Sequence, residues 1–546
     1  MSGPPGLEAI IRQLREDLAF RRIASGMQTL ESARPALAAL GPPVAHAGVF
    51  LGMLAQWVDA GFGGAELVRD LLARFPAPSR AALPLADYLH VRMAEGMVAL
   101  AEEDFEQANQ HFRFVQSLEG EVDDAELLAI ANFWTARCLR RIGRYDDALS
   151  FTAKATNLAN DCGYGPMAAV MQVLESWLAF QKGKLKEACA LLERAEATLG
   201  ATDDFVGRGN IQSAYGRIAR RQGRYEQALE YFDRAITEYK RWDPQHLHLA
   251  RSLVNIASVE RLIALRCQKQ IDRASARRRG ADALERSSEN SRARRMEVER
   301  LRSAARAHLA EAMQIYGQRR VHRGIGSVHI NSGLLHLDSG DLECAASEAL
   351  RAFSQGEEKR DYIVMARARM LQCTIENARL EEQIGEDPAR HAQLAYDCAR
   401  DAVEYARQTQ NRRLLARACV WQGLTHAGEH FQNREAARRC LDEARALLRS
   451  DAHEQEYEWE DLGALEARLL RTGEIDPILR EWSDGNTGGK TFQQITEEFA
   501  AVMIPKVWER EDRKISRVAD RLSISPKKVR RILQAAGLLG RGATED

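Results

Sequence analysis

The sequence predicts an all-α fold in which antiparallel helix pairs stack into a superhelix and a small three-helix domain follows. Three observations predict it. Only 14 of 546 residues are Pro, while 45% are hydrophobic and 28% charged, a mixture that favours helices. Small residues recur at a fixed interval through most of the chain. Beyond a Gly-rich stretch near the C-terminus this interval disappears, and a compact pattern of short amphipathic helices begins.

The interval is 40 residues, which is seen in a series of alanines: Ala108, Ala148, Ala188 and Ala228. Four residues after each alanine come Phe112, Thr152, Leu192 and Phe232, and seven after come Val115, Ala155, Ala195 and Ala235. Twelve before come Gly96, Ala136, Ser176 and Gly216, while Gly143, Gly183 and Gly223 stand five before three of the alanines. We expect the small residues to let two helices approach closely, and the glycines to form left-handed turns between them. Each pair then buries its apolar face only by stacking on the next pair.

An insertion interrupts this spacing. The next complete set, Ala305 with Leu309 and Ala312, follows Ala228 by 77 residues, or one interval plus 37. Residues 266–302 have that length and carry a net charge of +6, although the whole chain has −1. The insertion is interpreted either as a solvated extension of two helices or a disordered loop, or as a basic arm that contacts nucleic acid or an acidic partner. Later sets are Ala345/Ala349/Ala352, Ala395/Ala399/Ala402 and Ala437/Leu441/Ala444.

The segment Ser213–Ile236, SAYGRIARRQGRYEQALEYFDRAI, resembles the tetratricopeptide (TPR) consensus. The resemblance implies a TPR-like α-solenoid that forms a right-handed superhelix over residues 1–482. The 40-residue interval exceeds the standard length of about 34 residues. It is similar to the longer repeats of bacterial regulators that sense peptides or small molecules.

In such arrays the first helix of each pair lines the concave face, where peptides commonly bind. Counting from the spacing, the predicted groove residues are Arg137, Arg140, Arg141, Trp177, Phe180, Asn210, Arg217, Arg220 and Arg221. Arginines beside aromatic rings favour an acidic or carboxylate-bearing ligand. Alternatively, these arginines neutralise acidic side chains of adjacent repeats.

Residues 483–491 are predicted to form a flexible linker, and residues 492–541 a helical domain with Pro505 expected to kink or split its first helix. In this domain KISRVADRLSISPKKVRRILQAAGLL resembles the Fis-type helix-turn-helix, with Ala519 at the close approach of the helices. The resemblance places Leu522, Ile524, Val529 and Ile532 in the core. Ser523 stands where the family usually has glycine.

If the resemblance holds, the recognition helix follows the N-cap Ser525. Residues expected to contact DNA are Ser525, Lys527, Lys528, Arg530 and Arg531, with Arg513, Lys514 and Arg517 near the phosphate backbone. Residues 506–541 carry a net charge of +7, which supports this interpretation. The alternative is a C-terminal helical cap with a solvated basic face. Fis-type domains usually dimerise, so a homodimer is implied.

No enzyme, cofactor or metal site is predicted. The GGKT segment, with Gly489, lacks the glycine five residues earlier that a phosphate loop needs. Nine dispersed cysteines indicate reduced structural thiols, and no secretory signal or membrane span is found. We therefore expect a cytoplasmic protein.

The sequence thus predicts a bacterial-type transcription regulator whose repeat array senses a peptide, protein or small ligand and whose C-terminal domain binds duplex DNA. Two alternatives remain: a protein–protein interaction scaffold without DNA binding, and the regulatory subunit of a separate enzyme.

Overall fold

The computed structural model describes residues 6–42, 44–277, 284–384, 387–448, 458–471, 489–511, 513–536 and 538–539. Within these ranges every regular element is a helix, which confirms the all-α prediction. The chain divides into two compact units, residues 1–465 and 466–546. The division falls inside α23 (Glu458–Arg471), before the predicted end of the array at residue 482. Most of the predicted linker, residues 483–488, lies outside the described residues.

Unit 1 opens with short helices that do not follow the 40-residue spacing. They are α1 (Leu7–Ala19), α2 (Ile23–Ser32), α3 (Arg34–Ala38), α4 (Ala47–Asp59), α5 (Ala65–Leu72) and α6 (Ala77–Arg80). Helix α4 lies at the centre of this group, and its Trp57 is fully buried. A Cβ on Gly26 of α2 would lie 2.0 Å from the Trp57 ring, so glycine is required for this contact. The group caps the first end of the array, as terminal repeats generally do.

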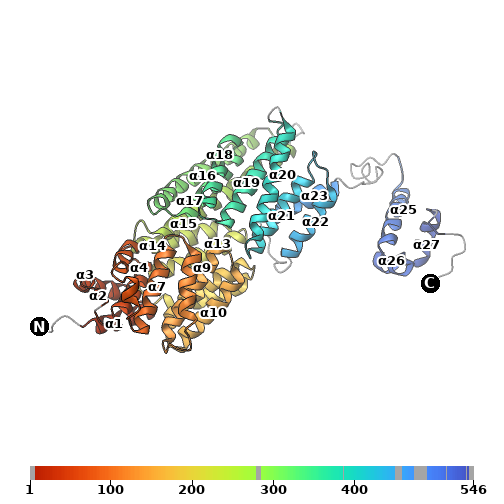
Figure 1. Cartoon of the computed structure of the whole chain (residues 1–546). Coiled ribbons are helices and arrows are strands. Elements are labelled where there is room, and N and C mark those ends of the chain that lie inside the picture. The colour runs from red at the N-terminus through yellow and green to blue at the C-terminus, as the bar shows by residue number, and fades with distance from the viewer. Residues whose placement is uncertain are drawn as a thin grey trace. The chain divides into compact units, whose positions relative to one another are not determined.

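Regular antiparallel pairs follow and stack in chain order (Figure 1). Their first helices are α7 (Leu85–Ala101), α9 (Ala125–Ile142), α11 (Gly165–Gln181), α13 (Phe205–Arg221), α15 (Leu247–Arg277), α17 (His322–Asp338), α19 (Tyr362–Glu381) and α21 (Arg412–His426). Their second helices are α8 (Phe105–Gln116), α10 (Tyr145–Asp161), α12 (Leu185–Leu199), α14 (Tyr225–Trp242), α16 (Leu284–Gln318), α18 (Leu342–Glu358), α20 (Pro388–Arg407) and α22 (Arg434–Leu448).

The small-residue spacing is confirmed by the packing. The alanines of the 40-residue series, from Ala108 to Ala228, are fully buried. A Cβ on Gly216 would lie 2.6 Å from the Phe232 ring, so α13 and α14 touch where the small residue was expected. The turn glycines Gly143, Gly183 and Gly223 have φ of +94°, +81° and +70°, the left-handed conformation that glycine adopts without steric cost.

The insertion is built as a helical hairpin. Both α15 and α16 continue well past the length of their neighbours. Buried residues hold the two extensions together, namely Ala264, Ile271, Val298 and Leu301. Arg292, Arg294 and Arg295 are exposed near its far end, while residues 278–283 lie outside the described part of the chain. The described residues of this segment extend two helices, and its role as a basic arm stays a prediction.

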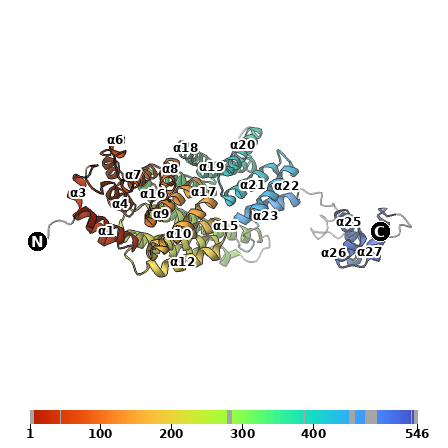
Figure 2. The same ribbon diagram turned by 60° about the horizontal axis from the view of Figure 1, so that its bottom comes forward.

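Unit 1 closes on itself, because late pairs reach back to early ones. The Gln410 backbone N–H donates to the Gly143 carbonyl oxygen at 2.9 Å, and the Gln410 Oε1 accepts from the Asp146 N–H at 2.9 Å across 264 residues. Arg323 Nη2 donates to the Arg141 carbonyl oxygen at 2.5 Å, and the His322 N–H to Glu103 Oε2 at 2.8 Å. We call these contacts the closing seam. Figure 2 shows α8 and α9 beside α17, where the seam forms.

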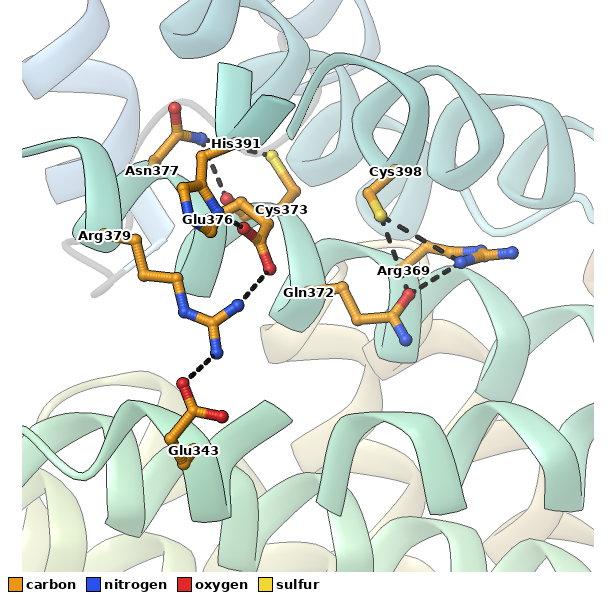
Figure 3. Close-up of polar contacts among 9 residues, drawn as sticks. All are labelled: Glu343, Arg369, Gln372, Cys373, Glu376, Asn377, Arg379, His391 and Cys398. Carbon is orange, nitrogen blue, oxygen red and sulfur yellow. Dashed lines mark hydrogen bonds and ion pairs between the residues drawn. The ribbon is translucent and has the colours of Figure 1, made fainter. Parts of the chain in front are cut away.

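A polar chain ties the later pairs together (Figure 3). The buried Glu376 of α19 accepts from Arg379 at 2.8 Å and contacts His391 of α20 at 2.6 Å. Arg379 also donates to Glu343 of α18 at 2.6 Å. Glu376 and Arg379 therefore each form two hydrogen bonds, which offsets the cost of removing their charges from water.

None of the nine cysteines forms a disulfide bond, in keeping with the reduced thiols expected from the sequence. Burial raises the pKa of Cys373 to about 12 and that of Cys398 to about 11, so both thiols stay protonated at neutral pH and are weak nucleophiles. Among the described helices, none is long and apolar enough to cross a membrane.

Unit 2 contains three packed helices: α25 (Phe492–Arg510), α26 (Ile515–Leu522) and α27 (Pro526–Ala535). Ile504, Trp508, Val518, Val529 and Leu533 form its core. Helix α25 runs through Pro505 without a break, so the expected split does not occur. The turn between α26 and α27 places Ser523 in the left-handed conformation, with φ of +52°, at the position where glycine was expected from the resemblance.

The close approach at Gly216 predicts a stability difference between two glycine variants. Gly216→Ala should lower the free energy of unfolding by about 1–3 kcal/mol, because its Cβ meets the Phe232 ring. Gly463→Ala in α23 meets nothing within 4 Å and should be neutral or stabilising by up to about 1 kcal/mol. Chemical denaturation compares the two, and equal effects would contradict the packing explanation.

The seam predicts a second difference between glycines at equivalent repeat positions. Gly223→Ala strains only the left-handed turn and should cost about 1 kcal/mol. Gly143→Ala carries the same strain and also brings a Cβ within 3.0 Å of Thr409 across the seam. We expect Gly143→Ala alone to speed hydrogen exchange at residues 409–411. Equal protection in both variants would show that the seam does not depend on this contact.

Candidate ligand cavity and basic helical face

Unit 1 contains a pocket of about 750 Å³ that is partly open to solvent. The first helices of successive pairs, from α7 to α15, supply most of its lining, together with α4, α5 and the turns before α15 and α17. This volume lies within the usual range for small-ligand sites, about 300–1,000 Å³. The concave face is therefore a bounded pocket at this end of the array.

The N-terminal helices close one side of the pocket. The Asp203 carboxylate accepts from the backbone N–H groups of Ile23 and Ala24, both at 2.7 Å, at the start of α2. Arg21 Nε donates to Asp204 Oδ2 at 2.8 Å. These charge-assisted bonds join the terminal helices to the turn before α13, so the off-spacing segment forms part of the pocket wall.

One wall of the pocket is strongly basic. Arg140, Arg141, Arg217 and Arg251, which we call the basic wall, all line it. No carboxylate in the described part of the chain forms an ion pair with any of them. Arg140 instead lies over the Trp177 ring at 5.0 Å, and its Nε is buried without a hydrogen-bond partner. Arg141 lies over the Phe105 ring at 5.5 Å.

The acidic residues of the pocket are paired elsewhere. Asp59 accepts from Arg137 at 2.9 Å, and Asp243 lies 3.5 Å from Arg319. Glu103 accepts a backbone N–H across the seam, as described above. Neutralisation within the array, the alternative predicted from the sequence, therefore applies to Arg137 and not to the basic wall.

The arginines of the basic wall repel one another. Burial and the charge of Arg251 lower the pKa of Arg217 to about 9. Burial, followed by Arg323 and Arg251, lowers the pKa of Arg141 to about 10. The pKa of Arg140 is lowered further by burial and by its arginine neighbours. Each shift means that positive charge is unfavourable here without an added anion.

The pocket also has an apolar lining. Met167, Val170, Met171 and Leu174 of α11 line it with Ile130, Phe133 and Trp134 of α9. Methionines adapt their shape readily to a ligand. The pocket therefore combines a cationic side with a hydrophobic side, an arrangement suited to an amphipathic anion.

The structure brings most of the predicted groove residues together. Those lining the pocket are Arg137, Arg140, Arg141, Trp177, Asn210 and Arg217. Three others point elsewhere. Arg221 lies over the Phe180 ring at 4.3 Å and donates to the Phe180 carbonyl oxygen, while Arg220 donates to Asn255 at 3.2 Å. Arg220, Arg221 and Phe180 stand at the distal ends of α11 and α13, beyond the pocket.

Other pocket residues were missed by the sequence analysis. Arg251, His246 and His248 come from the turn before α15 and its first residues, one repeat beyond the last one used for the predicted groove. Burial and Arg251 hold the pKa of His248 well below its usual value, so its imidazole is neutral. Glu103 reaches the pocket from the turn between α7 and α8. Repeat counting identifies helical positions, and it gives no signal for turns.

In unit 2 the predicted DNA-binding residues share an exposed region. The Ser525 side chain accepts from the Lys528 N–H at 3.3 Å and so caps α27. Lys527, Lys528 and Arg531 are exposed on α27, and Arg530 is half-buried. Arg513, Lys514 and Arg517 are exposed at the start of α26, where Arg513 lies 5.7 Å from the Trp508 ring.

A surface cluster was also not foreseen. His336, Asp341 and Cys344 place potential metal-ligand atoms within 4.8 Å of one another at the turn between α17 and α18. Asp341 already accepts from the Cys344 N–H at 3.1 Å as the N-cap of α18. Helix capping accounts for this arrangement.

Comparison with known proteins agrees with this architecture. The tetratricopeptide-repeat family profile matches residues 207–270, which cover α13, α14 and part of α15. No curated protein matches the sequence.

Solved structures resemble the chain in fold at low sequence identity. The crystal structure of a Rap protein complexed with competence and sporulation factor is 12% identical, with a TM-score of 0.50, and the match covers 73% of this chain and 98% of that chain. The apo form of the quorum sensor NprR from B. thuringiensis is 12% identical, with a TM-score of 0.47 and coverage of 72% and 98%. NprR in complex with its cognate peptide NprX is 12% identical, with a TM-score of 0.39 and coverage of 76% and 93%. The chain is thus similar to TPR-like helical solenoids.

Proposed function

We propose that this chain is a ligand-responsive regulator, which binds a peptide, protein or small ligand in the pocket of unit 1 and duplex DNA through unit 2. The observation that carries the proposal is the basic wall, because half-buried arginines that repel one another and form no ion pair favour an anionic ligand. The Rap protein of similar fold was solved with competence and sporulation factor, which is a reason to expect a ligand on this kind of scaffold.

The geometry of unit 2 supports DNA binding. A short helix, a tight turn at Ser523 and a capped basic helix follow one another, as in a helix-turn-helix. Exposed Lys and Arg on α27 suit phosphate and guanine contacts. Arg513 and Lys514 extend the positive surface toward the DNA backbone.

Helix α25 supports self-association. Phe492 is 86% exposed and Phe499 42% exposed, and Ile495 lies between them on the same face. The opposite face of α25 supplies Ile504 and Trp508 to the core of the unit. We infer that a second copy of α25 covers this apolar face, because a homodimer presents two recognition helices to a two-fold symmetric site.

The DNA-binding prediction is tested by selecting DNA fragments with the full chain. We expect a two-fold symmetric motif that is lost, with at least a tenfold weaker affinity, in the double variant Lys528→Glu with Arg531→Glu. Both side chains are exposed, so the fold should persist. The slope of log affinity against log salt concentration should also become shallower, because the variant loses about two phosphate contacts.

The matched control reverses two exposed charges on α12, Lys186→Glu with Arg194→Glu, and should keep the motif. If no motif is enriched, or if both double variants behave alike, the regulator proposal fails and a protein-binding scaffold explains the fold better.

The dimer prediction is tested by light scattering on the purified full chain. Phe492→Ser with Phe499→Ser should raise the dimer dissociation constant at least tenfold, because the apolar face is removed. Leu350→Ser with Leu394→Ser, which changes exposed leucines on α18 and α20, should leave it unchanged. A wild-type monomer at all concentrations would contradict the prediction.

A further inference from the structure

The charge balance of the pocket restricts the chemistry of its ligand. The acidic residues Asp59, Asp204 and Asp243 are each paired with arginines outside the basic wall. Asp203 caps α2, and Glu103 accepts across the seam. None of Arg140, Arg141, Arg217 and Arg251 forms an ion pair with these carboxylates, although the nearby charge of Glu103 partly offsets the lowering of the pKa of Arg141 by burial. The hydrogen-bond acceptor described for Arg251 is the neutral hydroxyl group of Tyr316.

A single anionic group would neutralise only part of this charge. The four guanidinium groups come from α9, α13 and α15, so they approach the pocket from three of the four successive pairs between α9 and α16. Arg140 is affected by the charges of all three other members of the wall, and Arg217 by that of Arg251. A ligand that contacts all three helices at once therefore needs two or more anionic groups.

The volume of the pocket suits a small ligand. The N-terminal helices close one side through Asp203 and Asp204, while the pocket stays partly open to solvent. Its volume of about 750 Å³ lies in the range of sites for compact small molecules. The apolar wall on α9 and α11 then faces the uncharged part of that molecule.

We propose that the pocket binds a compact polyanion, a small organic molecule with at least two phosphate or carboxylate groups, held by Arg140, Arg141, Arg217 and Arg251. This inference rests on the proposed function in one respect, since both take the pocket of unit 1 as the ligand site. Bound anions neutralise the basic wall and thereby stabilise the closed form of unit 1, because ligand binding to the folded state adds to its stability.

The proposal predicts opposite effects of one substitution in the two states. Without ligand, Arg217→Gln removes a repelling charge and should raise the melting temperature of unit 1 by a few degrees. With ligand, the same variant should lose most of the stabilisation by polyanions. A residue with a purely structural role would lower the melting temperature in both conditions. Arg194→Gln, at an exposed position on α12, is the matched control.

The experiment measures thermal unfolding of the full chain with tripolyphosphate, citrate, adenosine diphosphate or an eight-residue acidic peptide, each against NaCl of equal ionic strength. We expect a polyanion-specific rise of several degrees in the wild type and in Arg194→Gln, reduced at least threefold in Arg217→Gln and Arg251→Gln. The phosphate and carboxylate probes distinguish the two sources of negative charge.

Three results overturn the proposal: no rise beyond that with NaCl, an equal rise in all variants, or a rise with the acidic peptide alone that depends on Arg217. The last keeps the pocket as a ligand site and rejects the compact polyanion. Loss of DNA binding with polyanion binding intact instead rejects only the regulator function.

Discussion

The close approach of paired helices at small residues is the constraint on which the rest of the structure depends. Ala108, Ala148, Ala188 and Ala228 are fully buried because their partners lie too near for a larger side chain. Since the same contact recurs at equal intervals, successive pairs are related by similar rotations, and the array curves steadily. That curvature brings the turn after α9 to the turn before α21, where Gln410 meets Gly143. The seam and the pocket share Glu103 and Arg141, so the two features meet at this end of the array.

The repeating part of the fold was predictable from the sequence, since each position in a helix pair has a fixed relation to its neighbours. The same counting placed Arg140, Arg141 and Arg217 at the pocket. It did not place Arg251, because the predicted groove ended with the repeat of α13, and Arg251 lies in the first turns of α15. It also gave the wrong environment for Arg221, which stacks on Phe180 beyond the pocket. Closure itself depends on contacts between turns more than 200 residues apart, such as that between Gln410 and Asp146, and these carry no local pattern.

The surroundings of the positively charged side chains differ between the two units. In unit 1 the arginines of the basic wall are enclosed, so water screens them poorly and their mutual repulsion is large. In unit 2 the basic side chains of α26 and α27 are mostly exposed, where solvent and salt reduce their interaction. The Ser525 cap could be assigned from the sequence because capping is a local property. The exposed apolar face of α25 could not, since it became evident only once the core of the unit was known.

Closure also changes what kind of repeat protein this is. In an open solenoid each unit contacts only its neighbours, so units are gained or lost without harm to the remainder. Here Gly143 and Gln410 meet only when the number of intervening pairs and their summed rotation are correct. Duplication or deletion of one 40-residue unit would carry the two turns past each other. A change in repeat number would therefore break the seam, whereas the α15–α16 hairpin lengthens two helices without altering the number of pairs.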